Sequence, residues 1–279
     1  SSAMLEENTK EHGMTDQDIR QKLSGVKCFL LDMDGTFYLG NKLLDGSLDF
    51  LDAVERTGRQ VMFLTNNSSR SVRYYEEKLK RMNVREPFIR VMTSGQAACR
   101  YAMHEHPGQK AFLLGNKILK GELEEMGLLI DNEHPDYVLV AYDTELDYKK
   151  MDDACRFVRA GLPYIATHPD FNCPPEDGYA PDIGAIMAFI HASTGRMPDV
   201  VIGKPNAYIA KEAMRQSGMR AEELAMVGDR LYTDVETALR SGMCGILVMS
   251  GETDEAILAA SQTKPDLVFG RLADMIPYL

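Results

Sequence analysis

The sequence has no long apolar run and little positive charge. None of its apolar stretches approaches the length needed to span a bilayer, and the amino-terminal part lacks the continuous apolar region of a signal peptide. The chain carries 31 lysines and arginines against 42 aspartates and glutamates, which gives a net charge of −11. Nucleic acids and anionic membranes require a basic face, so neither is expected as a main partner. We expect a cytoplasmic protein, in which a site for any anionic ligand would have to supply its positive charge locally.

Cysteines are few, and no two of them form a Cys-x-x-Cys pair. They are an odd number at irregular spacing, and most lie in apolar or helical surroundings; the five are Cys28, Cys99, Cys155, Cys173 and Cys244. A disulfide framework or a zinc site is therefore not indicated, and we expect buried, reduced thiols. Internal repeats and low-complexity tracts are also missing from the sequence.

Apolar runs typical of buried strands alternate with helical periodicity along the 279 residues, a length that suggests one large or two ordinary domains. Strands are expected at 28–31, 61–64, 88–92, 111–114, 137–142, 164–167, 200–202, 224–227, 246–249 and 267–269. Helices are expected at about 46–58, 72–82, from after Gly95 to 105, and at 117–126, 148–160, 183–193, 207–217 and 235–241. The alternation predicts an α/β fold with a doubly wound, Rossmann-like parallel sheet.

A break at His106-Pro107-Gly108 divides this pattern, and the block that follows has enough strands and helices for a core of its own. We therefore prefer two domains. The first would be formed by 21–107 together with 197–279, and the second would be an α/β unit inserted at 108–196. The polar residues 1–20 are expected to form a flexible arm or a short helix.

The most informative stretch is Cys28 to Tyr38, Cys-Phe-Leu-Leu-Asp-Met-Asp-Gly-Thr-Phe-Tyr. Its first four residues predict a buried parallel strand that ends at Asp32 and Asp34. If the strand geometry persists, both carboxylates project from the same side of the sheet. Two like charges this close favour a bound cation, and Mg²⁺ prefers oxygen ligands. A calcium loop does not fit the residues around Gly35, so a simple polar strand exit is the structural alternative.

Polar residues also follow three other expected strands. Thr65 opens Thr-Asn-Asn-Ser-Ser-Arg-Ser before a helix, an arrangement that either binds an anion or caps the helix. Lys204 precedes a proline at a helix start, where it would neutralise carboxylates and phosphate. Strand ends open at one edge of a doubly wound sheet. We therefore expect convergence of Asp32, Asp34, Thr65, Lys204, Asp229 and Asp234 at that edge.

A long loop at 167–182 contains four prolines and separates the last strand of the inserted block from its last helix. It is longer than a connection requires, which makes it a candidate binding element. His168 in this loop could contact a substrate or could be an ordinary polar residue at a strand end.

These residues together resemble a known family. Asp32-Met33-Asp34-Gly35-Thr36, Thr65, Lys204 and Gly228-Asp229 to Asp234 resemble, in order, the four motifs of the haloacid dehalogenase superfamily. The inserted block resembles its large C2-type cap. Thr65-Asn66-Asn67-Ser68, Gly203-Lys204-Pro205 and Ala166-Thr167-His168-Pro169-Asp170 are similar to the NagD-like phosphatases. The resemblance covers nearly the whole chain after about residue 24.

The chain departs from that group at two positions. His168 stands where Asn is more usual, and Asp182 stands where Gly is common. Both lie in the loop that the resemblance identifies as the specificity loop, so they affect the expected substrate and leave the expected chemistry unchanged.

The resemblance implies a Mg²⁺-dependent phosphatase in which 108–196 is a cap over the catalytic core. Asp32 would be the nucleophile that forms an aspartyl phosphate, and Asp34 the acid and base. The metal would be held by Asp32, the backbone carbonyl of Asp34, and Asp229.

The same resemblance assigns the remaining residues. Thr65, the amide of Asn66 and Lys204 would bind the phosphate, with Asp234 as a supporting residue. In the cap, His168 and Asp170 would contact the substrate.

The substrate would be a small phosphorylated metabolite, with sugar phosphates, nucleotides and phosphoglycolate-like acids all open. Caps of this type often mediate dimers in the resembling family, so a homodimer through the cap is expected. Two other activities are alternatives to hydrolysis. A phosphotransferase or mutase would share every motif, whereas a phospho-acceptor switch would be shorter and lack the inserted domain.

Overall fold

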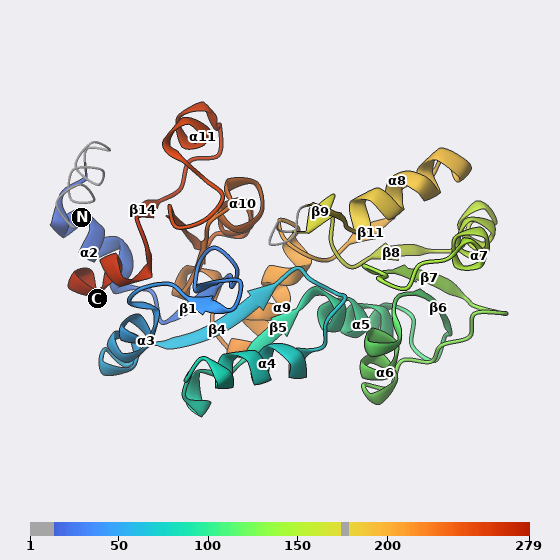
Figure 1. Ribbon diagram of the computed structural model, residues 1–279, viewed down its shortest axis with the longest axis horizontal. Coiled ribbons are helices and arrows are strands. Elements are labelled where there is room, and N and C mark those ends of the chain that lie inside the picture. The colour runs from blue at the N-terminus through green and yellow to red at the C-terminus, as the bar shows by residue number, and fades with distance from the viewer. Residues whose placement is uncertain (1–13, 174–178) are drawn as a thin grey trace. The chain divides into compact units, whose positions relative to one another are not determined.

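The computed structural model describes residues 14–173 and 179–279, and Figure 1 shows their helices and strands. The other residues of the predicted amino-terminal arm, and residues 174–178 of the predicted binding loop, lie outside the described residues. No helix within the described ranges is long and apolar enough to cross a membrane.

Helix α2 (Asp16–Ser24) lies inside the stretch predicted to be a flexible arm or a short helix. Its start is capped reciprocally, because the Thr15 side chain accepts from the Asp18 N–H and the Asp18 carboxylate accepts from the Thr15 N–H. Ile19 and Leu23 on this helix have no exposed surface. The described part of the predicted arm is therefore a packed helix.

The chain divides into two compact units. Unit 1 contains the residues up to Thr65, together with Glu76–Val91 and Ala210–Leu279, and unit 2 contains Asn66–Tyr75 and Met92–Ile209. Segments on both sides of the predicted insertion pack with unit 2, which is therefore larger than that insertion. The boundaries between a catalytic core and a cap stay predictions.

The main sheet is doubly wound, as the sequence predicted, and has the strand order β14-β13-β12-β1-β4-β5. The strands are β1 (Cys28–Leu31), β4 (Gln60–Thr65), β5 (Val91–Thr93), β12 (Leu224–Gly228), β13 (Cys244–Val248) and β14 (Leu267–Phe269). Strand β1 pairs in parallel with β4 on one side and with β12 on the other. The chain adds β4 and β5 on one side and later adds β12, β13 and β14 on the other, so the strand order reverses at β1. Ligands bind at such switch points.

The central strand is buried because both faces of the sheet are covered. All four residues of β1 are buried, as expected for a parallel strand with continuous apolar side chains. The Phe29 ring packs edge-on against Phe50 of α3 (Ser47–Arg56), with 5.5 Å between ring centroids. Helix α10 (Glu236–Ser241) packs against β12 and β13.

Unit 2 has a parallel sheet and a core of its own. The sheet order is β11-β8-β7-β6, and the strands are β6 (Ala111–Leu114), β7 (Tyr137–Val140), β8 (Tyr164–Ala166) and β11 (Val200–Val201). A small antiparallel pair, β9 (Asn172–Cys173) with β10 (Ala180–Pro181), belongs to the predicted binding loop. Residues of β6, β7, β8, α7 and α8 form one buried apolar cluster. The prediction of a second α/β unit is confirmed.

The remaining helical segments connect these strands. They are α4 (Val72–Arg81), η1 (Glu86–Phe88), α5 (Ser94–Glu105), α6 (Lys117–Glu125), α7 (Tyr148–Arg159), α8 (Ile183–Thr194), α9 (Ala207–Ser217), η2 (Ala221–Glu223), the π-helix η3 (Leu231–Val235), α11 (Glu255–Ala260) and η4 (Leu272–Tyr278).

One expected strand was placed wrongly, and several short elements were not predicted. The expected strand at 88–92 begins only at Val91, and the residues before it form the 3₁₀ turn η1. Pro87 is tolerated near the start of this turn, because an N–H group at that position would have no partner within the turn. The segment between β1 and α3 contains a short hairpin that was not predicted, β2 (Tyr38–Leu39) with β3 (Lys42–Leu43). Helices α11 and η4 were not predicted, because both are short and their pattern is weak.

All five cysteines are free. Cys28, Cys99 and Cys155 are buried, while Cys173 and Cys244 are half-buried. Burial raises the pKa of the Cys28 thiol to about 11, which keeps it protonated and unreactive at neutral pH.

The Phe29→Ala substitution is expected to lower the free energy of unfolding by about 3–5 kcal/mol, because it opens a cavity beside Phe50 in the centre of unit 1. Urea unfolding followed by circular dichroism measures the change. Phe189→Ala is the matched control, since the Phe189 side chain is 49% exposed and its loss should cost less than about 1 kcal/mol. Equal losses in the two variants would contradict this account of the core.

Candidate active site

Asp32 directly follows the central strand of unit 1. Its N–H donates to the Val227 carbonyl oxygen at 3.0 Å, so the backbone still pairs with β12 at this residue. After it, the N–H groups of residues 36–38 turn back to the Met33 carbonyl oxygen at 2.8–3.2 Å. Asp34 therefore lies beyond the strand, where it forms an isolated bridge with Tyr38 just before the turn at 35–37. The strand geometry that the sequence prediction assumed through Asp34 ends earlier, because a tight turn follows β1.

Two glycines allow neighbouring loops to approach Asp229 closely. Asp229 follows β12 and is only 4% exposed. A Cβ atom at Gly35 would lie 2.4 Å from Asp229 Oδ2, and one at Gly251 would lie 2.2 Å from it. Gly35 also has a φ of +84°, which larger residues rarely adopt. Ser250 Oγ donates to the Gly35 carbonyl oxygen at 2.8 Å and joins the two loops.

The polar atoms of Asp229 are only partly satisfied by the protein. Oδ2 accepts from the Glu252 N–H at 2.9 Å, and the main-chain oxygen accepts from Thr253 Oγ1 at 2.6 Å. Oδ1 is buried and has no hydrogen-bond partner among the described residues. A buried acceptor of this kind is costly unless another group satisfies it.

A second carboxylate is buried beside Asp229. Asp234 lies in η3 with no exposed surface, and its Oδ2 accepts from the Arg230 N–H at 3.2 Å. Carboxylate oxygens of Asp32, Asp229 and Asp234 lie within 4.8 Å of one another. The side chain of Asp34 is not in this group. The sequence analysis gave Asp32, Asp34 and Asp229 as ligands with Asp234 in support, and these roles stay predictions.

The three clustered carboxylates fit a divalent cation. Burial and the neighbouring charges of Asp32 and Asp234 raise the pKa of Asp229 to about 8. Burial disfavours the charged form of the carboxyl group, and nearby negative charges repel it. A hard cation such as Mg²⁺ takes oxygen ligands and would neutralise the group while satisfying Asp229 Oδ1. The residues present are therefore suited to hold such an ion.

The helix that follows Thr65 is capped from within the chain. The Val72 N–H donates to Glu122 Oε2 at 2.8 Å, and the Tyr74 N–H donates to Ser71 Oγ at 3.1 Å. These N–H groups at the start of α4 are thus already bonded within the protein. Of the two interpretations of the segment after Thr65, a helix cap is therefore favoured over an anion-binding site. Thr65 itself is half-buried at the end of β4, and its contact with phosphate stays a prediction.

In unit 2, the side-chain carboxamide of Asn66 bonds to the main chain of Lys204. Asn66 Oδ1 accepts from the Lys204 N–H at 2.8 Å, and Asn66 Nδ2 donates to the Lys204 carbonyl oxygen and to Asp170 Oδ1, each at 3.0 Å. A Cβ atom at Gly203 would lie 2.6 Å from Asn66 Oδ1 and 2.7 Å from His168 Cβ. The structure therefore brings together four residues that the sequence predicted for phosphate and substrate binding. Its division into units leaves the approach of Lys204 to Asp32 a prediction.

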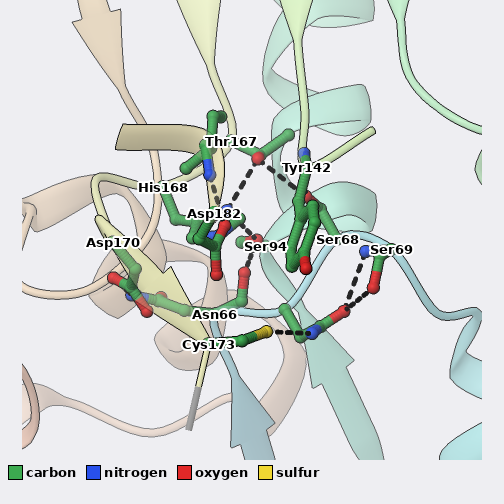
Figure 2. Close-up of polar contacts among 12 residues, drawn as sticks. Asn66, Ser68, Ser69, Ser94, Tyr142, Thr167, His168, Asp170, Cys173 and Asp182 are labelled. Atoms are coloured by element: carbon green, nitrogen blue, oxygen red, sulfur yellow. Dashed lines mark hydrogen bonds and ion pairs between the residues drawn. The ribbon is translucent and has the colours of Figure 1, made fainter. Parts of the chain in front are cut away.

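His168 lies in a second polar cluster of unit 2, shown in Figure 2. Ligand atoms of His168, Asp170 and Asp182 lie within 4.8 Å of one another. His168 has no exposed surface. Its Nε2 atom lies 2.8 Å from Asp182 Oδ1, and its Nδ1 atom lies 2.8 Å from Thr167 Oγ1. Both ring nitrogens are therefore engaged by the protein, which disfavours a metal ligand here.

Sequence analysis did not identify the loop around Asp229 or the hydroxyl groups around His168. Gly251, Glu252 and Thr253 follow strand β13 and hold Asp229, whereas Ser68 and Ser94 come from distant parts of the chain. The exit of β13 through Ser-Gly at the same sheet edge was a usable signal for the first group. Nothing local in the sequence indicated the second.

Comparison with known proteins gives matches along most of the chain. A family model described as haloacid dehalogenase-like hydrolase matches residues 29–129, and a model described as HAD-hydrolase-like matches residues 201–275.

Three individual proteins show the extent of the similarity. An acid sugar phosphatase of Staphylococcus aureus is 35% identical over 254 residues, which are 91% of this chain and 98% of the relative. The crystal structure of a 4-nitrophenylphosphatase from Thermotoga maritima is 44% identical with a TM-score of 0.89, and the match covers 92% of this chain and 98% of that chain. The structure of a putative NagD protein is 41% identical with a TM-score of 0.86, covering 91% and 99%.

Without metal, the folded chain is expected to lose stability as pH rises from about 4 to about 8. An unfolded aspartate titrates near pH 3.9, whereas the pKa of folded Asp229 is about 8. Between these values the folded state binds more protons, so raising the pH favours unfolding. Mg²⁺ should offset the loss and therefore raise the melting temperature more at pH 8 than at pH 6.

Thermal unfolding by circular dichroism, in EDTA and in Mg²⁺, measures both effects. Asp229→Asn should flatten the pH dependence and remove the response to Mg²⁺. Asp45→Asn is the matched control, because the Asp45 side chain is 92% exposed. An unchanged pH dependence in Asp229→Asn would show that another group causes it.

Proposed function

We infer the activity of this chain from its family: the chain belongs to the haloacid dehalogenase-like hydrolases, and it is a phosphatase of their NagD-like branch. We propose that it hydrolyses small phosphate monoesters, that it requires Mg²⁺, and that the reaction passes through an aspartyl phosphate on Asp32.

This proposal rests on the cluster of three carboxylate side chains near the carboxyl ends of β1 and β12. Asp32, Asp229 and Asp234 offer oxygen atoms within 4.8 Å of one another, and one buried oxygen of Asp229 lacks a partner among the described residues. Such a group is unfavourable for folding alone, because burial and mutual repulsion both oppose its ionisation. A bound cation and a phosphate explain why it is present.

The reaction proceeds in two displacements. In the first, a carboxylate oxygen of Asp32 attacks the phosphorus atom, the bond from phosphorus to the leaving oxygen breaks, and Asp34 protonates that oxygen. In the second, Asp34 takes a proton from water, the water oxygen attacks the phosphorus, and the bond to Asp32 breaks to release phosphate. Asp34 is half-buried just before the turn at 35–37, close enough in sequence to Asp32 to serve both steps.

The metal would be held by Asp32, the Asp34 carbonyl oxygen and Asp229, with Asp234 in support. When bound, Mg²⁺ supplies positive charge to the phosphate and to the carboxylates that face it. The protein holds Asp229 for this purpose through Glu252 and the loop closed by Gly251.

Phosphate binding is assigned to Thr65, the Asn66 amide and Lys204, which would stabilise the charge on the transferring group. Lys204 is 3% exposed, and a lysine in such a position is typical of charge neutralisation rather than of solubility. Asp170 in the loop that precedes β9 would contact the leaving group.

The substrate is proposed to be a small phosphorylated metabolite. One similar protein is named an acid sugar phosphatase, which makes sugar phosphates the first compounds to assay. A cytoplasmic location is inferred from the free cysteines. A homodimer through the cap, and the absence of nucleic-acid and membrane partners, stay predictions.

Asp32→Asn is expected to lower turnover of a generic aryl phosphate with Mg²⁺ by at least about 10³-fold, because an amide cannot act as the nucleophile. Release of free phosphate is measured with and without an added alcohol acceptor, which separates hydrolysis from phosphotransfer. Asp45→Asn serves as the exposed control. Turnover near that of the wild type in Asp32→Asn would exclude Asp32 as the nucleophile.

Asp34→Asn is expected to let the first displacement of an aryl phosphate occur and to slow the second, because a good leaving group needs little protonation whereas water still needs a base. Rapid quenching followed by intact mass spectrometry should then detect the added phosphoryl group on the protein. An unchanged rate with no trapped phosphoprotein would mean that Asp34 is neither acid nor base.

A further inference from the structure

The two residues that depart from the NagD-like pattern contact each other. His168 Nε2 lies 2.8 Å from Asp182 Oδ1, and the side chains are 0% and 4% exposed. Asp182 is the residue before α8, and its carboxylate also accepts from the Ile183 N–H. Figure 2 shows the pair at the centre of the polar contacts of unit 2.

Hydrogen-bond directions indicate that His168 carries a proton on Nδ1. Ser94 Oγ donates its single hydrogen to the Asn66 carbonyl oxygen, and Thr167 Oγ1 lies 3.0 Å from Ser68 Oγ. Both hydroxyl oxygens lie near Nδ1, at 2.8 and 3.4 Å. Because the Ser94 hydrogen is bound to the Asn66 carbonyl oxygen, Ser94 Oγ can only accept from Nδ1, and Thr167 Oγ1 is able to accept from it as well.

Asp182 lies at the start of α8. It receives an N–H at the start of the twelve-residue helix α8, where the helix dipole stabilises negative charge. A carboxylate there requires a donor on His168 Nε2, so both ring nitrogens are protonated and the pair is ionic.

The charges around the ring support this state. Burial lowers the pKa of His168, but the charge and hydrogen bond of Asp182, together with the charge of Asp170, outweigh burial and Lys204 and raise it. A buried ion pair adds little stability in itself, but removal of one partner leaves the other charge uncompensated.

The segment that follows His168 packs closely against the start of α8. The Gly184 N–H donates to the Asp170 carbonyl oxygen at 2.7 Å, and the Asp182 N–H donates to the Phe171 carbonyl oxygen at 2.9 Å. A Cβ atom at Gly184 would lie 2.8 Å from the Pro169 carbonyl oxygen. The backbone of 168–171 is therefore held tightly against the start of α8.

The same segment holds the Asn66 carboxamide, which bonds both main-chain polar atoms of Lys204. The Gly203 N–H donates to the Thr167 carbonyl oxygen at 2.8 Å. Lys204 is thus fixed from two directions by residues that adjoin His168.

We propose that His168 and Asp182 are positioning residues, which form a buried ion pair that fixes the 168–171 segment and, through Asp170 and Asn66, the backbone of Lys204. This inference rests on the proposed role of Lys204 in neutralising the transferring phosphate. His168, which the sequence predicted as a substrate contact, acts in this arrangement without touching the substrate.

Nuclear magnetic resonance of the ring nitrogens tests the ion pair in the unmodified protein. At pH 7 both nitrogens of His168 should be protonated, and the ring should lose its proton at a higher pH than an ordinary histidine does. His168→Asn identifies the signal. A neutral His168 ring at pH 7 overturns the proposal, and this measurement needs no variant that retains activity.

A double-mutant cycle tests the coupling to catalysis. His168→Asn and Asp182→Asn should each lower kcat by about tenfold with KM changed by less than about threefold, because the loss falls on charge stabilisation in the transition state. The double variant should lose about tenfold, since the pair acts as one unit. Losses that multiply to about a hundredfold, or folded single variants with wild-type kcat, contradict the proposal.

Two further variants separate the possible failures. His191→Asn on α8 is the matched control and should leave kcat unchanged, because its side chain is exposed. Lys204→Ala should lower kcat more than either positioning variant. If Lys204→Ala retains wild-type turnover, the proposed function of Lys204 is wrong. If it loses turnover while the folded His168 and Asp182 variants do not, only the positioning proposal is wrong.

Discussion

Repulsion between buried carboxylates is the constraint on which unit 1 depends. Parallel strands all end on one side of the sheet, and in this chain β1 and β12 lie next to each other and lead into Asp32 and Asp229. The strand order reverses at this point, so no crossover covers the edge. The fold therefore brings together negative charges that a stable core would normally exclude, and it does so at the place where a cation and a phosphate would be most useful.

The residues around these carboxylates leave room for them but do not satisfy all of their oxygen atoms. Gly35 and Gly251 leave the space that Asp229 Oδ2 occupies, and Gly228 does the same for Asp234, where a Cβ atom would lie 2.1 Å from the carboxylate. Only one carboxylate oxygen of Asp229 accepts a main-chain N–H, and the other has no hydrogen-bond partner among the described residues. Functional sites commonly keep such unsatisfied groups, whereas structural cores do not.

Unit 2 uses its buried charges differently. His168 and Asp182 compensate each other, and the hydroxyl groups of Thr167, Ser68 and Ser94 complete the bonding around the ring. A network in which every member has a partner fixes one arrangement of the backbone. The two units therefore differ: the carboxylates of unit 1 need a cation to balance their charge, whereas His168 and Asp182 in unit 2 balance each other.

The sequence by itself determined the doubly wound parallel sheet, the second α/β unit and the carboxylates at the ends of β1 and β12, because apolar strand runs and the residues that follow them are adjacent in the chain. It did not determine the turn that follows Asp34, the capped start of α4, or the division that places Asn66 in unit 2. His168 and Asp182 are separated by a loop, and Asn66 is 138 residues from Lys204. Only the tertiary structure decided these pairs, because contacts between distant residues depend on how loops and helix starts pack, and no local pattern records that packing.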